Sequence, residues 1–196
     1  MVTPTVGAFL AMNNPSNRPL ITTDRTNLTI LQPSQALLMQ TYYVLNWRFL
    51  KPWEPTRSDA FFSLHGWQGA LERYNRNFDQ GTAINFAALN LANDEVIGVV
   101  NFSNIVHGPF QACHLGYSLA EKYQGQGLMF EILDKLISYV FNQYHLHRIM
   151  ANHLPDNIRS EKLLKRLGFE KEGYAKSYLQ IDGKWQDHVL NSRIND

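Results

Sequence analysis

The stretch KYQGQGLMF, residues 122 to 130, places two glycines one residue apart at the mouth of an apolar run. A helix that begins here leaves unpaired N–H groups with a partial positive charge, and such groups attract anions. The dinucleotide fingerprint would need a third glycine where Phe130 stands, and the Gly-Lys-Ser/Thr of the P-loop is absent. The residues alone leave two interpretations open: an anion site of another kind, or a turn that only reverses the chain.

The segments on either side of this stretch predict a strand, a turn and a helix. Residues 128–144 have the apolar period of a helix, and residues 111–119 have the composition of a strand. Two more strands are expected at 83–91 and 96–106, because the short segments between the three strands are rich in turn formers. The sequence therefore predicts an antiparallel meander that leads into the glycine turn.

The N-terminal half predicts one strand and two helices. Residues 26–31 alternate as a strand does, and Pro33-Ser34 opens a helix that is expected to end near Asn46. A proline-rich elbow, FLKPWEP at residues 49–55, follows this helix. Ser58 is then expected to cap a second amphipathic helix that stops at Gly81.

The C-terminal part predicts a strand, a helix and a hairpin. Residues 147–154 have the length of a buried strand, and the PDN that follows opens a helix ending at Gly168. Residues 177–190 read as a hairpin around Asp182-Gly183, a pair that tolerates the positive φ of a type I′ turn. The predicted order is β-α-α-β-β-β-α-β-α-β-β.

Length and charge favour one globular domain. A chain of 196 residues can bury one substantial core, so a single domain over residues 20–196 is predicted, after a loose tail at residues 1–19. The 18 basic and 17 acidic residues leave a net charge of +1, which provides no strong global field for nucleic acid or a membrane. Neither partner is predicted, and no apolar run is long enough to span a bilayer.

The cysteine and histidine residues indicate which redox compartment suits the protein and whether a metal site is expected. The single cysteine, Cys113, excludes an internal disulfide, suits a reducing cytoplasm and is expected to fill core space. The seven histidines form no pair spaced by four residues with an acidic partner, so no metal is predicted. The apolar residues 6–12 are too short for a signal-peptide core, so a cytoplasmic location is expected.

The glycine stretch resembles the pyrophosphate loop of the GNAT N-acetyltransferases, Q/R-x-x-G-x-G/A. Gln124 and Gly127 match this pattern, while Met129 stands where the family has a small residue. The predicted order of elements is also that of the family, and further similar blocks are FLKPWEP, GVVNFSN, LGYSL, HRIMAN, LLKRLGFEKEGYAK and YLQIDGKWQDHVL. The resemblance implies an α/β (mixed α+β) acyl-CoA N-acyltransferase fold, whose mostly antiparallel twisted sheet is splayed at the cofactor cleft and flanked by helices.

These blocks are similar to the GNAT enzymes that acetylate the N-terminal alanine of a small-subunit ribosomal protein. The resemblance implies acetyl-CoA as cosubstrate, direct attack of the amine on the thioester, and a ribosomal protein, alone or on the small ribosomal subunit, as partner. Two alternatives stay open: a GNAT enzyme for another protein N-terminus or a small-molecule amine, and a non-catalytic acetyl-CoA-binding or ribosome-assembly protein.

The resemblance also implies where acetyl-CoA binds. The backbone of the segment Tyr117, Ser118 and Leu119 would pair with the pantetheine arm, and Asn157 would bond its amide. Asn157 and Ser160 also have an ordinary interpretation as the start of a helix. The pyrophosphate would be held by backbone amides of Gln124, Gly125, Gln126, Gly127, Leu128 and Met129.

The same resemblance suggests the groups that act on the substrates. Ser160 would protonate the leaving thiolate. A related ribosomal acetyltransferase has an acidic residue before a Tyr-Leu pair, but this chain has Ser177 there, so the base stays open between Glu54, Asp187, His153 and water. Trp53, Glu54 and Tyr178 are expected to contact the substrate, which would enter between the elbow and the Asp182-Gly183 hairpin.

Overall fold

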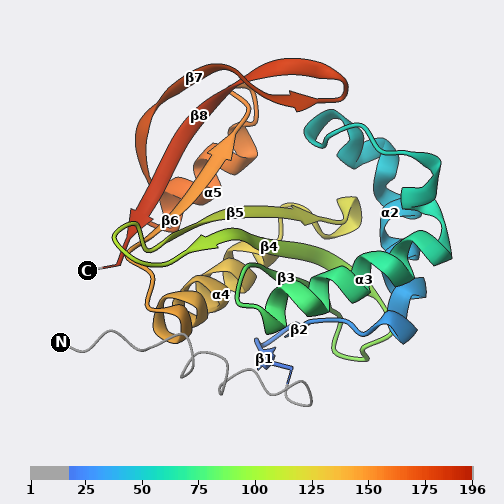
Figure 1. The fold of residues 1–196 in the computed structure, drawn as a ribbon. Coiled ribbons are helices and arrows are strands. Elements are labelled where there is room, and N and C mark those ends of the chain that lie inside the picture. The colour runs from blue at the N-terminus through green and yellow to red at the C-terminus, as the bar shows by residue number, and fades with distance from the viewer. Residues whose placement is uncertain (1–17, 196) are drawn as a thin grey trace.

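The computed structural model describes residues 18–195, and over these it forms one sheet of eight strands (Figure 1). The strand order is β1-β2-β3-β4-β5-β6-β8-β7. Every neighbouring pair is antiparallel except β5 and β6, which run parallel. The strands are β1 Leu20–Thr22, β2 Asn27–Thr29, β3 Ile84–Leu89, β4 Val96–Val106, β5 Ala112–Leu119, β6 Arg148–His153, β7 Glu170–Ile181 and β8 Lys184–Ile194.

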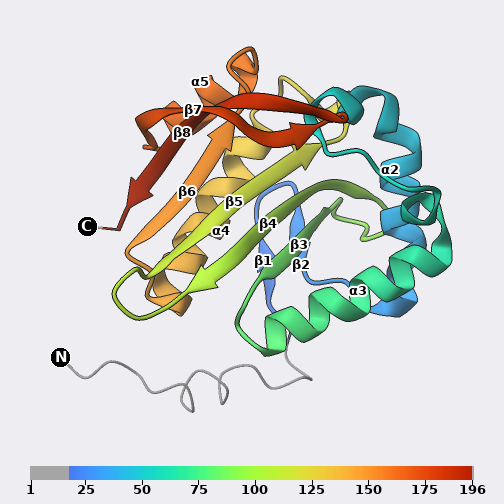
Figure 2. The same cartoon turned by 45° about the horizontal axis from the view of Figure 1, so that its top comes forward.

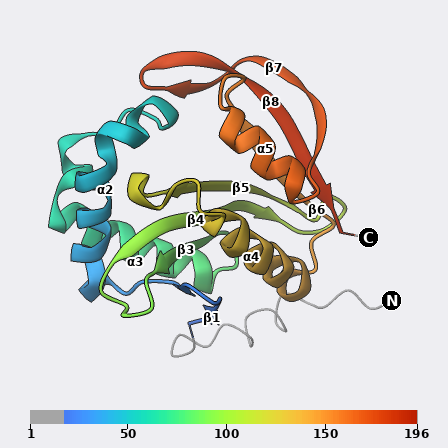
Figure 3. The ribbon, with the colours of Figure 1, turned by 180° about the vertical axis from the view of Figure 1, so that it is seen from behind.

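Helices cover both faces of this sheet, which confirms the predicted fold class. Helices α2 (Ala36–Leu50) and α3 (Leu64–Asp79) lie on one face and α4 (Leu128–Tyr144) on the other, as Figures 1 and 3 show from opposite sides. The short helix α5 (Ile158–Arg166) follows β6 and packs Leu164 into the core beneath α4. Short 3-10 turns lie at residues 33–35, 51–53, 59–62 and 121–123.

The two cores explain why these segments fold as they do. Along α4 the apolar residues recur at spacings of three and four, and they are fully buried against the sheet. On the opposite face Trp67 of α3 stacks on Tyr43 of α2 with ring centroids 5.0 Å apart. Cys113 is buried in the first core, and burial raises the pKa of its thiol to about 12, as suits a packing residue.

Several predicted elements are confirmed. The meander β3-β4-β5 has the expected antiparallel pairing, and α4 spans the predicted residues 128–144. Asp182 and Gly183 both have positive φ, 44° and 76°, at the turn between β7 and β8. These elements were predictable because the spacing of apolar residues and the positions of turn-forming residues are local features of the sequence.

Four boundaries were predicted wrongly. The short strand β1 was missed, and α2 continues to Leu50 instead of ending near Asn46. Ser58 precedes only a 3-10 turn, and Ser63 caps α3 by accepting a hydrogen bond from the Gly66 N–H. The hairpin is longer than predicted, because β7 begins at Glu170 and pairs with β8 as far as Ser192. Strand pairing defined β1 and lengthened β7 beyond their local signals, whereas α3 begins later than its predicted cap.

Gly98 in β4 lies where β4, β5 and the start of α4 pack closely together. A Cβ at this position would lie 2.9 Å from the Ser118 carbonyl oxygen and 3.5 Å from Cε of Met129. Met129 is buried and packs in the core beneath α4. The close approach of the Ser118 carbonyl group therefore requires glycine at position 98, whereas a Cβ there would only touch Met129 at an ordinary contact distance.

The hairpin β7-β8 arches over the end of the sheet toward the segment after α2 (Figures 1 and 2). At its tip the Asp182 N–H donates to the Glu54 carbonyl oxygen at 2.9 Å, and the Lys51 ammonium lies 3.7 Å from the Asp182 carboxylate. The tips of the elbow and the hairpin therefore bond to each other, and the substrate entrance between the two segments stays a prediction.

The remaining expectations concern the N-terminal tail, membrane-spanning helices and metal-binding groups. The predicted tail, residues 1–19, lies outside the described residues except for Arg18 and Pro19, and Arg18 forms an ion pair with Asp79 of α3. Between residues 18 and 195, no helix has the length and apolar character needed to cross a membrane. Over the same range no three metal-binding side chains come together.

Candidate active site

The sheet opens where β5 and β6 part. These two strands pair over three residues only, from Ala112 with Arg148 to His114 with Met150. Beyond that point β5 stays with β4 as far as Leu119, whereas β6 stays with β8 as far as His153. The last residues of β5 therefore turn one backbone edge toward a gap instead of toward a neighbouring strand.

A cleft of about 810 Å³ occupies this gap. Its volume lies within the range of sites for large cofactors and small ligands. The walls come from the end of α2 and the elbow, from β4 and β5, from the glycine stretch and the start of α4, and from β6, α5 and β8. The predicted site residues that line the cleft are Trp53, Glu54, Tyr117, Ser118, Leu119, Gln124, Gly125, Gly127, Leu128, Met129, Asn157 and Ser160.

The glycine stretch lines the cleft with bare backbone. Gly125 and Gly127 have φ of 74° and 72°, a left-handed conformation that side chains disfavour, and a Cβ on either would meet no atom within 4 Å. Within residues 18–195, the N–H groups of Gly125 through Phe130 have no protein acceptor. A series of free donors thus lies at the N-terminus of α4, which suits an anion.

Gln124 departs from its predicted role as a backbone donor. Its N–H donates to the Glu121 carbonyl oxygen at 3.1 Å, and its side-chain amide donates to the Leu119 carbonyl oxygen at 2.9 Å. Gln124 therefore fastens the turn to the end of β5, and the free amides begin at Gly125. Gln126 does not line the cleft, although it lies between two glycines that do.

Two hydroxyl groups meet deep in the cleft. Ser160, in the first turn of α5, lies 2.7 Å from the Tyr117 hydroxyl of β5. Burial raises the pKa of Tyr117 to about 12, against the opposite effect of its hydrogen bond with Ser160. Asn157 caps α5 by accepting from the Ser160 N–H at 3.1 Å, so its capping interpretation is confirmed.

Comparison with known proteins identifies the fold that carries this cleft. The family model described as "Acetyltransferase (GNAT) domain" matches residues 18–170. The chain belongs to the GNAT acetyltransferase family.

Individual relatives agree with this assignment. The chain is 50% identical over 179 residues to the ribosomal protein uS5-alanine N-acetyltransferase of Escherichia coli (strain K12), a match covering 90% of this chain and 92% of that protein. The crystal structure of a ribosomal-protein-S5-alanine acetyltransferase from Vibrio fischeri has a TM-score of 0.87 at 40% identity, covering 91% of this chain and 97% of that one. RimJ from Mycobacterium smegmatis, at 24% identity and a TM-score of 0.82, covers 92% and 88% of the two chains and supports the fold alone.

In this GNAT chain the elbow forms one wall of the cleft, but Glu54 does not present a free carboxylate there. Its Oε2 lies 2.5 Å from the guanidinium of Arg57, which also lines the cleft and stacks over the ring of Phe61. The pair adds no net negative charge that would attract a substrate ammonium. Trp53 lines the same wall and is partly exposed.

The other substrate residue predicted, Tyr178, lies outside the lining of the cleft. It follows Ser177 in an irregular part of β7, where the Ser177 N–H donates to Asp187 at 2.8 Å. Its hydroxyl reaches the amide of Asn152, a lining residue, at the long distance of 3.4 Å. Hydrogen bonds from Ser177 and Tyr174 lower the pKa of Asp187, so this carboxylate is a poor proton acceptor.

Two buried histidines line the cleft from β6 and β8. The ring nitrogen Nδ1 of His153 lies 2.9 Å from the Leu154 carbonyl oxygen, and Nδ1 of His188 lies 3.1 Å from that of Gln186. A carbonyl oxygen can only accept, so each Nδ1 is the donor, and Nε2 has the lone pair when the ring is neutral. Nε2 of His153 has no hydrogen-bond partner within the described part of the chain, and burial lowers the pKa of His188.

Several of these residues carried no sequence signal for the site. Arg57 lies in the loop after the elbow, Asn152 in β6 and His188 in β8, and only the folded sheet brings them to one cleft. The basic residues Arg159, Lys162 and Arg166 of α5 line the cleft, with Arg166 stacked 3.8 Å over the ring of Phe130. Their spacing of three and four residues places them on one face of the helix.

A matched pair of substitutions tests the free amides. Gly127→Gln and Gly127→Glu are nearly equal in size and both meet the same positive φ, so they share the backbone cost, roughly 1–2 kcal/mol. Only the glutamate adds a negative charge beside the anion-binding end of α4. Titration calorimetry with coenzyme A should therefore show an affinity for Gly127→Glu about tenfold or more below that of Gly127→Gln, with a smaller gap at high salt. Equal affinities would contradict an anion site.

Proposed function

We propose that this chain transfers the acetyl group of acetyl-CoA to the α-amino group of the N-terminal alanine of ribosomal protein uS5. The observation that carries the proposal is the 50% identity over 90% of the chain to the Escherichia coli enzyme named for that reaction. Because the substrate is a ribosomal protein, the proposed reaction takes place in the cytoplasm, with the protein free or on the small subunit.

The cleft fits coenzyme A in two respects. The glycine stretch offers free N–H groups and open space above Gly125 and Gly127, where a diphosphate can approach the backbone. The unpaired edge of β5 from Leu115 to Leu119 can bond the amide-rich pantetheine arm as an added strand. The bound cosubstrate supplies the acetyl group as an activated thioester.

We assign proton donation to the Tyr117–Ser160 pair. A leaving thiolate needs a proton, and Ser160 at the start of α5 lies beside the proposed course of the pantetheine arm. A serine hydroxyl is a weak acid on its own. The Tyr117 hydroxyl, 2.7 Å away, can return a proton to Ser160, so the two would act as one unit.

We assign proton acceptance to His153. Among the three candidates, Asp187 lies outside the lining and Glu54 is paired with Arg57. His153 lines the cleft, and its Nε2 is buried without a hydrogen-bond partner in the described part of the chain, so proton transfer to Nε2 requires a side-chain movement that admits the substrate or a water molecule. The role is limited to removing a proton from the attacking amine, directly or through water.

A double-mutant cycle tests the hydroxyl pair. Ser160→Ala and Tyr117→Phe should each lower kcat, by roughly 10- to 100-fold, within or below the range that general acids supply. The double variant should be no slower than the slower single one, because both remove the same proton path. Tyr42→Phe serves as a matched control, since it removes the other tyrosine–serine hydroxyl contact of β5, to Ser118. Additive losses in the cycle would refute the shared path.

A pH series tests His153. His153→Asn can keep a donor for the Leu154 carbonyl group but has no basic nitrogen, so kcat/KM should fall about tenfold or more near pH 7. An α-amino group loses its own proton near pH 8, so the deficit should narrow above that pH. Stopped or continuous thiol-release assays between pH 6.5 and 9.5 measure it. A deficit that is constant across this range would remove His153 from proton transfer.

A peptide series tests the substrate. The uS5 N-terminal peptide beginning with alanine should react faster than the same peptide beginning with leucine or tryptophan, because a small first side chain lets the amine approach the thioester. A lysine-containing peptide with a blocked N-terminus should be inert. If the blocked peptide reacts as fast as the free one, the chain is a side-chain acetyltransferase; if small amines react best or nothing reacts, the proposed substrate is wrong.

A further inference from the structure

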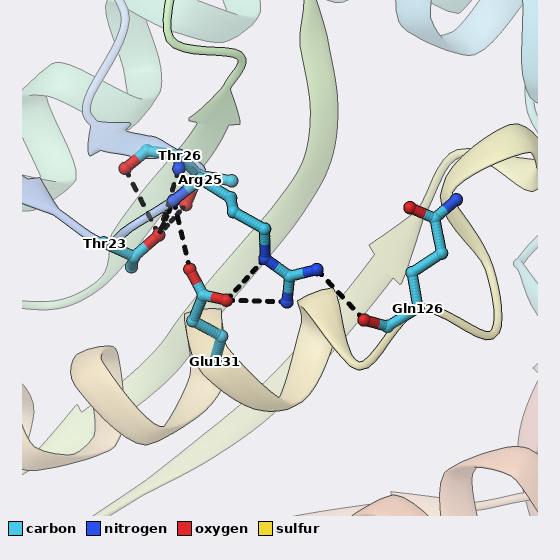
Figure 4. Close-up of polar contacts among 5 residues, drawn as sticks. All are labelled: Thr23, Arg25, Thr26, Gln126 and Glu131. Carbon is cyan, nitrogen blue, oxygen red and sulfur yellow. Dashed lines mark hydrogen bonds and ion pairs between the residues drawn. The ribbon is translucent and has the colours of Figure 1, made fainter.

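Arg25, in the turn between β1 and β2, binds the glycine stretch at Gln126, a residue that does not line the cleft (Figure 4). Its Nε and a terminal nitrogen lie 2.7 and 2.6 Å from Oε2 of Glu131, and its other terminal nitrogen donates to the Gln126 carbonyl oxygen at 3.0 Å. The backbone N–H of Arg25 also donates to Glu131 at 3.3 Å. One side chain thus joins the glycine stretch to the first turn of α4.

The turn that carries Arg25 is closed by its own hydrogen bonds. Oγ1 of Thr23 accepts from the N–H groups of Arg25 and Thr26 at 3.2 and 3.0 Å, and the Thr23 N–H donates to the Thr26 carbonyl oxygen at 2.9 Å. Thr26 is completely buried, β1 pairs with β2, and β2 pairs with β3. Arg25 therefore extends from a fixed support, as Figure 4 shows.

The contact with Gln126 fixes the direction of a peptide group. The Gln126 carbonyl and the Gly127 N–H belong to one planar trans peptide, so they point in opposite directions. Arg25 holds the carbonyl on the outer side, where Gln126 does not line the cleft. The Gly127 N–H is thereby directed away from Arg25, and Gly127 does line the cleft.

The contact with Glu131 cancels a charge that would oppose an anion. Glu131 lies in the first turn of α4, the same end that offers the free amides. Burial raises the pKa of Glu131, but hydrogen bonds from Thr23 and Arg25 outweigh it and lower the pKa, so the carboxylate is ionised. Unpaired, it would repel a diphosphate bound one turn away. The pair is half-exposed and by itself contributes little to stability.

We propose that Arg25 is a positioning residue for the diphosphate of acetyl-CoA. It directs the Gly127 N–H into the cleft and neutralises Glu131 at the anion-binding end of α4. This inference rests on the proposed function, because it assumes that the cleft binds coenzyme A.

The test compares a full and a truncated cosubstrate. Arg25→Ala should raise KM for acetyl-CoA about tenfold with kcat little changed, and should leave kinetics with S-acetyl-pantetheine, which has no diphosphate, as in the wild type. Arg148→Ala is the matched control, because it removes another arginine–glutamate pair, with Glu172, at the far end of β6. Thermal unfolding without ligand should be alike for the two variants.

Two further variants separate the parts of the role. Arg25→Lys keeps the charge but not the planar fork, so it should restore part of the affinity for coenzyme A. Glu131→Gln in the Arg25→Ala background should also restore part of it, since the unpaired charge is gone. The positioning role is refuted if neither variant restores affinity for coenzyme A. It is also refuted if Arg25→Ala loses as much activity with S-acetyl-pantetheine as with acetyl-CoA.

The wild type distinguishes the two proposals. If it binds coenzyme A in calorimetry and Arg25→Ala binds it equally well, only the inference about Arg25 fails. If the wild type has no affinity for coenzyme A, the proposed function fails and the inference falls with it.

Discussion

The structure depends on one constraint, the three-residue limit of the pairing between β5 and β6. A parallel pair that continued to the ends of both strands would fill the sheet and leave no gap. Because β5 is held by β4 and β6 by β8, each strand finds a partner on its outer side and neither needs the other. The cleft, the free edge of β5 and the meeting of Tyr117 with Ser160 all follow from this separation.

The glycine stretch shows how backbone can take the place of side chains at a binding site. Left-handed φ at Gly125 and Gly127 turns the chain tightly enough for several successive N–H groups to stay without partners among residues 18–195. Such a stretch needs outside support, since its own residues make few contacts. Arg25 comes from a turn a hundred residues earlier in the chain and provides that support at the Gln126 carbonyl group.

The fold class and most elements could be predicted from the sequence, because apolar period, turn residues and the family pattern are local signals. The glycine stretch was predicted correctly as the start of α4. The sequence could not reveal that Arg57 neutralises Glu54, or that the Gln124 N–H is already bonded within the turn, because these contacts depend on side-chain rotamers and loop closure. Strand β1 was missed for a similar reason: three residues carry too little pattern to mark a strand that only pairing with β2 defines.

The bond between the hairpin tip and the elbow has a topological consequence. Through Asp182 and Glu54 the polypeptide closes a loop around the cleft, formed by α2, the sheet, β8 and the hairpin. A closed loop can be threaded by the free end of another chain, whereas an internal segment would have to enter doubled back on itself and needs about twice the cross-section. Selection of a chain end over an internal backbone segment can thus arise from the connectivity of the walls, before any side chain recognises the substrate.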